Sequence, residues 1–171
     1  MDAMEMVARL MEVSAVTAPK SLGENFVHTR ILSAGEVDKL AEAMAAFGRK
    51  TGKQNFDRDA KSLLGAGVLL IGIKDARPVG LRCGACGFSS CDELARQKKI
   101  QGEFSGPVCA FRLLDMGIAL GSAVKTASLL NVDNRIMYRI GVVARDMGLV
   151  DWDFTMGIPL SVTGKNVFFD R

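Results

Sequence analysis

Histidine, tryptophan and tyrosine are almost missing from this chain, since each occurs once in 171 residues. With a single histidine, His28, a metal site built from several imidazoles is excluded, and no acid–base pair that could form a catalytic centre is present. Aromatic residues are too few for a surface that stacks bases, and the net charge is only +3. The basic run at 96–99 is expected to be a solvated helix face, with a docking patch for an acidic redox partner as the alternative. We therefore name no catalytic residue and expect no nucleic-acid partner.

A long uninterrupted apolar run is missing as well. A membrane-spanning helix needs about 20 apolar residues, and the longest candidate, 110–130, contains Arg112, Asp115 and Lys125. The chain opens with Met-Asp-Ala-Met-Glu, without the basic region of a secretory signal. Four cysteines in a chain of this character favour metal or redox chemistry over disulfides. We expect a cytoplasmic protein that has no membrane partner.

Helical and strand patterns alternate along the chain. The clearest local signals are two capping boxes, Ser33 with Glu36 and Ser90 with Glu93, each of which should begin a helix. The expected helices cover 3–15, 34–48, 57–64 and 109–130. A last helix is expected to be capped by Asn131 or Asp133 and ended by Gly148. The expected strands cover 26–32 and 68–73, and the tail from 157 to 169 is expected to form one or two more. This pattern predicts an α+β fold: one layered domain over residues 1–171, with helices packed on a mixed sheet.

All four cysteines fall within one segment, 80–112, with the spacing C-x2-C-x4-C-x17-C. A [4Fe–4S] cluster needs four thiolates, commonly three from one tight loop and a fourth from elsewhere. The loop supplies Cys83, Cys86 and Cys91, and Cys109 returns from a later position. Gly84 and Gly87 allow positive φ angles and bring backbone N–H groups close to sulfur. The spacing therefore predicts one [4Fe–4S] cluster bound within 80–112.

Structural zinc is the competing interpretation of the same cysteines. Zinc sites of four cysteines commonly pair two C-x2-C knuckles. Here Cys91 and Cys109 stand far apart and form no second knuckle. Zinc is therefore the less favoured metal.

The cysteine segment resembles the small four-cysteine [4Fe–4S] domain of electron-transfer and corrinoid-linked proteins of anaerobes. Beyond that segment, most of the chain resembles an uncharacterised prokaryotic family described as ferredoxin-domain-containing. The resemblance is carried by residues 17–20, 58–60, 131–135 and 157–171, together with the cysteine loop. It implies a cofactor and leaves the reaction and the substrate open.

A second resemblance is to nitroreductase-like flavoproteins. It is carried by Thr17-Ala-Pro-Lys-Ser-Leu-Gly-Glu-Asn25, by Asp115-Met-Gly-Ile-Ala-Leu-Gly-Ser122 and by Gly157-Ile-Pro159. The phosphate-binding Arg-Arg-Ser-x-Arg start of those proteins is absent, and Arg9 is the only arginine near that position. The resemblance implies a nitroreductase-like fold, an FMN site and a homodimer with shared flavin sites. The residues implied to contact the flavin are Lys20, Asn25, Gly121 and Ser122, with Lys165 or Arg171 at the phosphate.

Three functions follow from these patterns. The first is a one-cluster protein that transfers electrons to or from a partner protein or a bound flavin. The second is an FMN-dependent oxidoreductase that is fed by the cluster and acts on a small molecule. The third is a zinc-stabilised binding module without redox activity. The length of chain outside the cysteine segment favours the second function, and the altered flavin motifs favour the first; whether the protein is an enzyme stays open.

Overall fold

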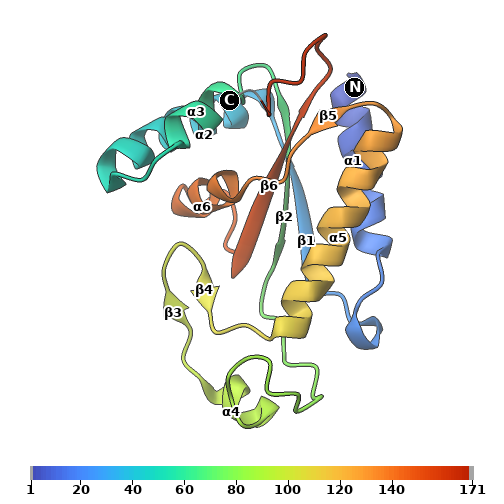
Figure 1. Cartoon of the computed structure of the whole chain (residues 1–171), viewed down its shortest axis with the longest axis vertical. Coiled ribbons are helices and arrows are strands. Elements are labelled where there is room, and N and C mark those ends of the chain that lie inside the picture. The colour runs from blue at the N-terminus through green and yellow to red at the C-terminus, as the bar shows by residue number, and fades with distance from the viewer. Residues whose placement is uncertain (1, 170–171) are drawn as a thin grey trace.

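The computed structural model describes residues 2–169 as helices packed on both faces of a small sheet. Figure 1 views this sheet nearly edge-on, with α1 and α5 on one side and α2, α3 and α6 on the other. The cysteine segment extends from the lower end of the sheet, and both termini lie at the opposite end (Figure 1). The α+β fold class is confirmed.

The helices account for most of the chain outside the sheet. Their bounds are α1 Ala3–Thr17, α2 Ala34–Thr51, α3 Phe56–Lys61, α4 Cys91–Arg96, α5 Ala110–Leu129 and α6 Tyr138–Asp146, with a short 3-10 turn, η1, at Ser21–Gly23. The capping box of Ser33 and Glu36 begins α2 as predicted. No helix within residues 2–169 combines the length and the apolar character that crossing a membrane requires.

The sheet has four strands in the order β1-β2-β6-β5. Their bounds are β1 Val27–Leu32, β2 Gly67–Ile73, β5 Asp133–Asn134 and β6 Phe154–Ser161, and a separate hairpin pairs β3 Ile100–Gln101 with β4 Ser105–Gly106. All pairings are antiparallel, so the sheet is not mixed in strand direction. The central strand β2 is buried along almost its whole length, as its continuous apolar run predicts.

Each face of the sheet has its own apolar core. Leu69 and Ile71 of β2 point toward α1 and α5, where Met11 and Ala119 are fully buried. Val68 and Leu70 point to the other side, toward α2, α3 and α6. Alternate side chains of a strand face opposite ways, which is why one strand serves two cores.

Several predicted boundaries are wrong for identifiable reasons. Helix α2 continues past Gly48 and is capped by Gly52. A Cβ atom at position 48 would stand 2.8 Å from Cβ of Phe56, so Gly48 permits the close packing of α3 and does not end the helix. Asn131, at φ 56°, follows the end of α5, and Asp133 lies in strand β5, so neither caps α6; Met137 occupies that position. The tail forms one strand, within the one or two expected, but this strand begins at Phe154 instead of Gly157, and residues 162–169 form no strand.

Candidate metal centre

The four cysteines meet beyond the end of the sheet, between the last residue of β2 and the start of α5. One pocket is lined by all four: Cys83, Cys86, Cys91 and Cys109. Cys83 is exposed, Cys86 and Cys91 are half-buried, and Cys109 is buried. Cys91 is the first residue of α4 and Cys109 is the N-cap of α5. Four sulfur atoms that are distant in sequence therefore share one site.

Two glycines shape the loop between the first three cysteines. Gly84 and Gly87 have φ angles of 73° and 82°, and the N–H of Gly87 donates to the carbonyl of Gly84 over 2.9 Å. Both positive φ angles were predicted from the spacing, and they let the chain reverse within the loop.

The second capping box forms only in part. The Ser90 hydroxyl accepts from the Glu93 N–H at 3.1 Å, but the Glu93 carboxylate turns to Ser89 instead.

Backbone N–H groups donate to two sulfur atoms of the loop. The N–H of Ala110, the first residue of α5, lies 3.1 Å from Sγ of Cys86. The N–H of Arg82 lies 3.3 Å from Sγ of Cys91, and Arg82 reaches it in the left-handed region, at φ 51°. Such bonds stabilise negative charge on sulfur, which suits thiolates that ligate a metal.

The Cys109 thiol lies close to several backbone N–H groups. Burial alone would raise its pKa, but the N–H groups of Val79, Arg112 and Phe111 and the thiol of Cys86 together hold the pKa below its ordinary value. Burial raises the pKa of the Cys86 thiol, and the neighbouring sulfur of Cys109 adds to that effect. Cys109 is therefore the thiol of this pair that ionises more readily.

The donor set matches the chemistry of an iron–sulfur centre. The pocket is lined by four thiols and by no histidine, aspartate or glutamate, and thiolates are the ligands of [4Fe–4S] clusters. The side chains are not yet placed as ligands, however: among residues 2–169, no group of three or more histidine, cysteine, aspartate or glutamate side chains is arranged to hold a metal ion. Because Cys86 and Cys109 hydrogen-bond to each other, their side chains must rotate toward a common centre before both can ligate one metal centre.

Lys20, which was expected near a flavin, hydrogen-bonds to backbone carbonyls at the end of α1. Its Nζ atom donates to the carbonyls of Ala15, Val16 and Ala18 at 2.8, 2.7 and 2.7 Å. These bonds occupy all three N–H donors of the ammonium group. Burial lowers the pKa of Lys20, and the charge of Asp115 opposes that shift. Lys20 therefore caps the C-terminus of α1 and has no donor left for a ligand.

The other residues of the expected flavin site lie apart within one chain. Asn25 accepts from the Val27 N–H at 3.1 Å, next to the cysteine end of the molecule. Gly121 and Ser122 lie in the middle of α5, exposed and half-buried. Lys165 follows β6. Its neighbour Asn166 donates to Asp133, which lies beyond the C-terminal end of α5. Arg171 lies outside the described residues.

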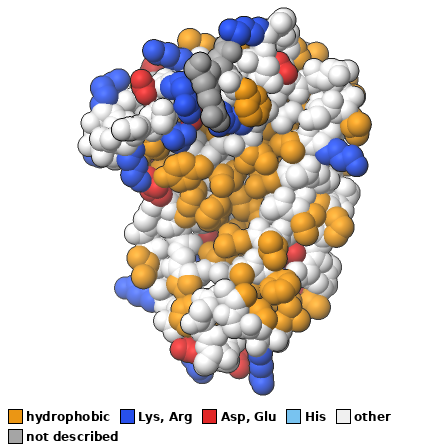
Figure 2. Space-filling view, in the orientation of Figure 1, with side chains coloured by type: hydrophobic (Ala, Val, Ile, Leu, Met, Phe, Trp, Pro, Cys, Tyr) orange, Lys and Arg blue, Asp and Glu red, His pale blue; other side chains and the backbone are white. Residues whose placement is uncertain are grey.

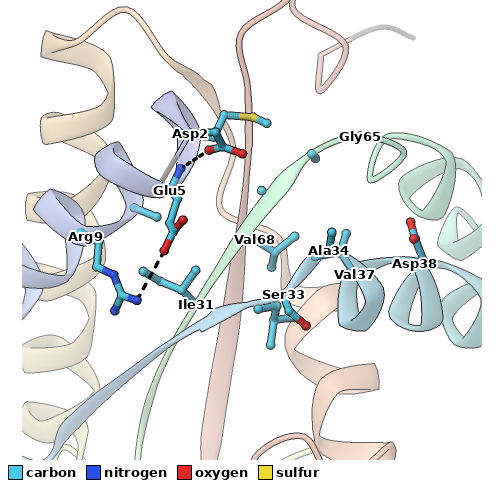
Figure 3. A pocket seen from close by; sticks show the side chains of 15 residues that line it. Asp2, Glu5, Arg9, Ile31, Ser33, Ala34, Val37, Asp38, Gly65 and Val68 are labelled. Atoms are coloured by element: carbon cyan, nitrogen blue, oxygen red, sulfur yellow. Dashed lines mark hydrogen bonds and ion pairs between the residues drawn. The ribbon is translucent and has the colours of Figure 1, made fainter.

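The largest cavity, of about 550 Å³, lies away from the cysteines. Figure 3 shows it between the N-terminus of α1, the end of β1 and the start of α2. Arg9 lines it, but its guanidinium pairs with Glu5 at 3.6 Å and with Glu12 at 3.4 Å. Asp2 accepts from the Glu5 N–H at 2.7 Å (Figure 3). Its polar side chains are thus largely paired with one another.

Sequence reasoning missed the structural role of Arg112 and Asp115, which do not line the cysteine pocket but lie next to it on α5. Arg112 is 1% exposed and Asp115 is 5% exposed, and both follow Cys109 closely on α5. Their signal was present, because an arginine and an aspartate three residues apart on an otherwise apolar helix form an ion pair on one face. In the sequence these two charges argue against a membrane span, and Asp115 also opens the segment that resembles nitroreductase-like flavoproteins.

Two sequence comparisons identify relatives of the chain. The profile of a family described as uncharacterized proteins containing a ferredoxin domain (DUF2148) matches residues 105–171, which include Cys109 but not the other three cysteines. An uncharacterized protein from Archaeoglobus fulgidus is 45% identical over 171 residues, which cover 99% of this chain and 92% of the relative.

Solved flavoproteins share the fold at low sequence identity. The FMN-dependent nitroreductase NfnB from Mycobacterium smegmatis, solved in complex with NADPH, is 16% identical with a TM-score of 0.59, over 100% of this chain and 84% of that one. Nitroreductase A from Vibrio parahaemolyticus is 13% identical with a TM-score of 0.59; the match covers 97% of this chain and only 60% of that one. A BluB-like flavoprotein from Clostridium difficile is 14% identical with a TM-score of 0.51, over 98% of this chain and 88% of that one. The expected nitroreductase-like fold is confirmed.

Proposed function

Because the chain belongs to the family of uncharacterized proteins that contain a ferredoxin domain, we propose that it is a redox protein that carries one [4Fe–4S] cluster. The proposed ligands are Cys83, Cys86, Cys91 and Cys109. The observation that carries the proposal is the pocket that brings these four thiols together while backbone N–H groups donate to two of them. Such a cluster exchanges one electron at a time with a partner protein or with a second cofactor.

The position of the site supports electron transfer. Cys83 is exposed, and the cysteine segment projects from one end of the fold (Figure 1). A partner can therefore approach the site closely. The N–H groups that donate to sulfur favour the more negative, reduced state of a cluster, which raises its reduction potential. The chain thus supplies both access and stabilisation of charge.

Anaerobic reconstitution tests this proposal. The protein is incubated with ferrous iron and sulfide, desalted, reduced with dithionite and examined by electron paramagnetic resonance, with bound iron and sulfide measured in parallel. A [4Fe–4S] protein retains iron and sulfide in equal amounts and gives a signal only after reduction. Retention of zinc in place of iron, with no signal after reduction, would support the binding module instead.

A second candidate function, an FMN-dependent oxidoreductase, is favoured by an open apolar hollow. Figure 2 shows this hollow between the two layers of helices, over β6, which is drawn in front of β2 in Figure 1. On β6, Phe154 and Met156 are only half-buried, and the Phe104 ring stacks on Phe154 at 4.0 Å. A flat apolar ring such as that of a flavin fits the character of this surface. Titration of the protein with FMN, followed by quenching of flavin fluorescence, distinguishes the two candidates.

The outer faces of α1 and α5 support the proposal that two copies associate. On α1, Leu10 and Val13 are exposed by 45% and 60%, beside further apolar side chains. On α5, Leu114 and Ile118 are exposed by 58% and 48%, and a Cβ atom added at Gly121 would meet nothing within 4 Å. The two helices pack side by side, with the hydroxyls of Ser14 and Thr126 2.6 Å apart. A contiguous apolar face of this kind suits an interface between two copies.

Light scattering coupled to size-exclusion chromatography tests the dimer. We expect the wild-type protein to elute with the mass of two chains. Ile118→Glu should shift it to one chain, because it places a charge in the proposed interface. Leu64→Glu, at a position that is 72% exposed outside this face, is the matched control and should remain dimeric. A monomeric wild-type protein rejects the interface.

A further inference from the structure

Arg112 is the largest fully buried side chain of the described chain, at 1% exposure. It lies in the first turn of α5, three residues after the N-cap Cys109. A buried guanidinium is costly unless its five N–H donors find partners and its charge is balanced. Here the guanidinium makes four hydrogen bonds, and two carboxylates, Glu24 and Asp115, balance its charge.

The guanidinium of Arg112 binds two loops at once. Its Nε atom donates to the carbonyl of Arg77 at 2.9 Å, and Nη1 donates to the carbonyl of Ser21 at 3.0 Å. Nη2 donates to the carboxylate of Glu24, and the guanidinium carbon lies 4.7 Å from the centre of the Phe26 ring. Arg112 therefore ties the first turn of α5 to the segment after β2 and to the loop after α1.

Asp115 completes this set of contacts. Its Oδ2 atom lies 3.3 Å from Nη1 of Arg112, and its Oδ1 atom accepts from both the N–H and the hydroxyl of Ser21 at 2.8 Å. Glu24 and Asp115 together balance the charge of Arg112. The group is thus a network of hydrogen bonds and ion pairs that links the start of α5 to both loops.

The segments that Arg112 ties together are those that donate N–H groups to sulfur. Arg82, whose N–H donates to Cys91 at 3.3 Å, follows Arg77 by five residues on the same segment. Ala110, whose N–H donates to Cys86, lies in the same helical turn as Arg112. The backbone N–H of Arg112 itself donates to the carbonyl of Cys109 at 3.0 Å. One side chain therefore sets the spacing between two groups of sulfur donors.

We infer that Arg112 is a positioning residue for the metal centre: it holds the backbone N–H donors on the cysteine sulfurs and thereby raises the reduction potential of the cluster. The inference rests on the proposed [4Fe–4S] function. Hydrogen bonds to ligand sulfur stabilise the reduced cluster, which carries one more negative charge than the oxidised one. Loosening these donors therefore favours the oxidised state.

Two substitutions separate geometry from charge. Arg112→Lys keeps the positive charge but loses the fork of donors that spans both loops. Arg112→Met removes the charge and the donors together. The matched control is Arg139→Met, because Arg139 makes another ion pair between elements, with Asp59 at 2.8 Å on the α3–α6 side of the sheet. Glu24→Gln, at a half-buried partner of Arg112, is a milder variant that tests the network if the Arg112 variants fail to fold.

The measurements are hydrogen–deuterium exchange of the protein without metal and a redox titration of the reconstituted protein. We expect faster exchange in peptides that span residues 76–82 and 109–113, and a more negative potential, in both Arg112 variants and to a smaller extent in Glu24→Gln. Arg139→Met should change neither quantity. Wild-type exchange and potential in Arg112→Lys, or equal shifts in Arg139→Met, would overturn the inference. The exchange experiment needs no cluster, so it gives its answer even if the wild-type protein binds no iron.

Discussion

The backbone N–H of Ala110 donates to Sγ of Cys86 over 3.1 Å, although 24 residues separate the two. The first N–H groups of a helix have no partner inside the helix, so α5 offers a free donor where the cysteine loop returns. The positive end of the helix dipole lies at the same place. The start of α5 therefore both presents Cys109 and stabilises negative charge on the sulfur of Cys86.

Removing one ligand should prevent stable cluster binding. We expect Cys109→Ala, assayed after anaerobic reconstitution, to retain little iron, because three thiolates leave one corner of the cluster without a protein ligand. Ala85→Ser is the matched control, since it changes an exposed residue between Cys83 and Cys86 without adding or removing a thiol. Equal iron content in wild type and Cys109→Ala would show that Cys109 is not a ligand.

Lys20 should matter for stability and not for ligand binding. Lys20→Met removes three hydrogen bonds to the last carbonyls of α1 and a positive charge at the negative end of the helix, so we expect a loss of about 1 kcal/mol in the free energy of unfolding. Urea denaturation followed by circular dichroism measures it. Lys125→Met, on the exposed face of α5, is the control and should change stability little. An unchanged midpoint for Lys20→Met would contradict the capping role.

The carboxylate of Glu36 should make stability depend on pH. The backbone N–H and the hydroxyl of Ser33, with the charge of Arg30, hold the pKa of Glu36 below its ordinary value of 4.5. A carboxyl with a lowered pKa contributes stability that is present above pH 4.5 and is lost as the pH falls through the lowered folded value. We therefore expect wild type to be more stable than Glu36→Gln near pH 7.

The difference between wild type and Glu36→Gln should shrink as the pH falls below about 4.5. Urea midpoints measured from pH 7 downward, with both proteins in the same state of metal loading, test this. Glu42→Gln, on an exposed face of the same helix, controls for the general effect of losing one negative charge. A difference that stays constant down to the acid limit would contradict the assignment.

Gly141 should tolerate no side chain. A Cβ atom at this position of α6 would lie 1.8 Å from the carbonyl oxygen of Thr155 on β6. Because that contact is with backbone, α6 must move away from the sheet, and we expect Gly141→Ala to cost at least about 2 kcal/mol. Gly35→Ala, at a helical position where a Cβ atom meets nothing within 4 Å, should be neutral or stabilising. Thermal unfolding of both variants makes the comparison.

Local signals in the sequence predicted much of the fold. The capping box at Ser33 and the apolar run of β2 each depend on neighbouring residues, and each gave its element at nearly the right place. Gly48 and Asp133 misled the prediction, because what decides their roles is contact with distant residues. Gly48 meets Phe56 across a turn, and Asp133 pairs with Ser161 of the last strand.

At the candidate site, too, local signals could be predicted from the sequence and contacts between distant residues could not. The spacing of the cysteines predicted one centre, and the structure lines one pocket with all four. The N–H donor of Arg82 could not be predicted from the sequence, because a backbone donor leaves no signature in residue type. The pair of Arg112 and Asp115 had a local signal, but the two loops that Arg112 binds are distant in sequence, so that contact could not be predicted. The flavin residues were inferred from resemblance alone. Lys20 turned out to cap its own helix, a role that its position two residues after Ala18 could have suggested.

The absorbance spectrum of the protein purified without oxygen, before and after addition of dithionite, tests the central claim most directly. We expect a brown protein with a broad band near roughly 400 nm that bleaches on reduction, as thiolate-bound iron–sulfur clusters do. A protein that stays colourless, even after reconstitution with iron and sulfide, would contradict the cluster and leave zinc as the better account of the four cysteines.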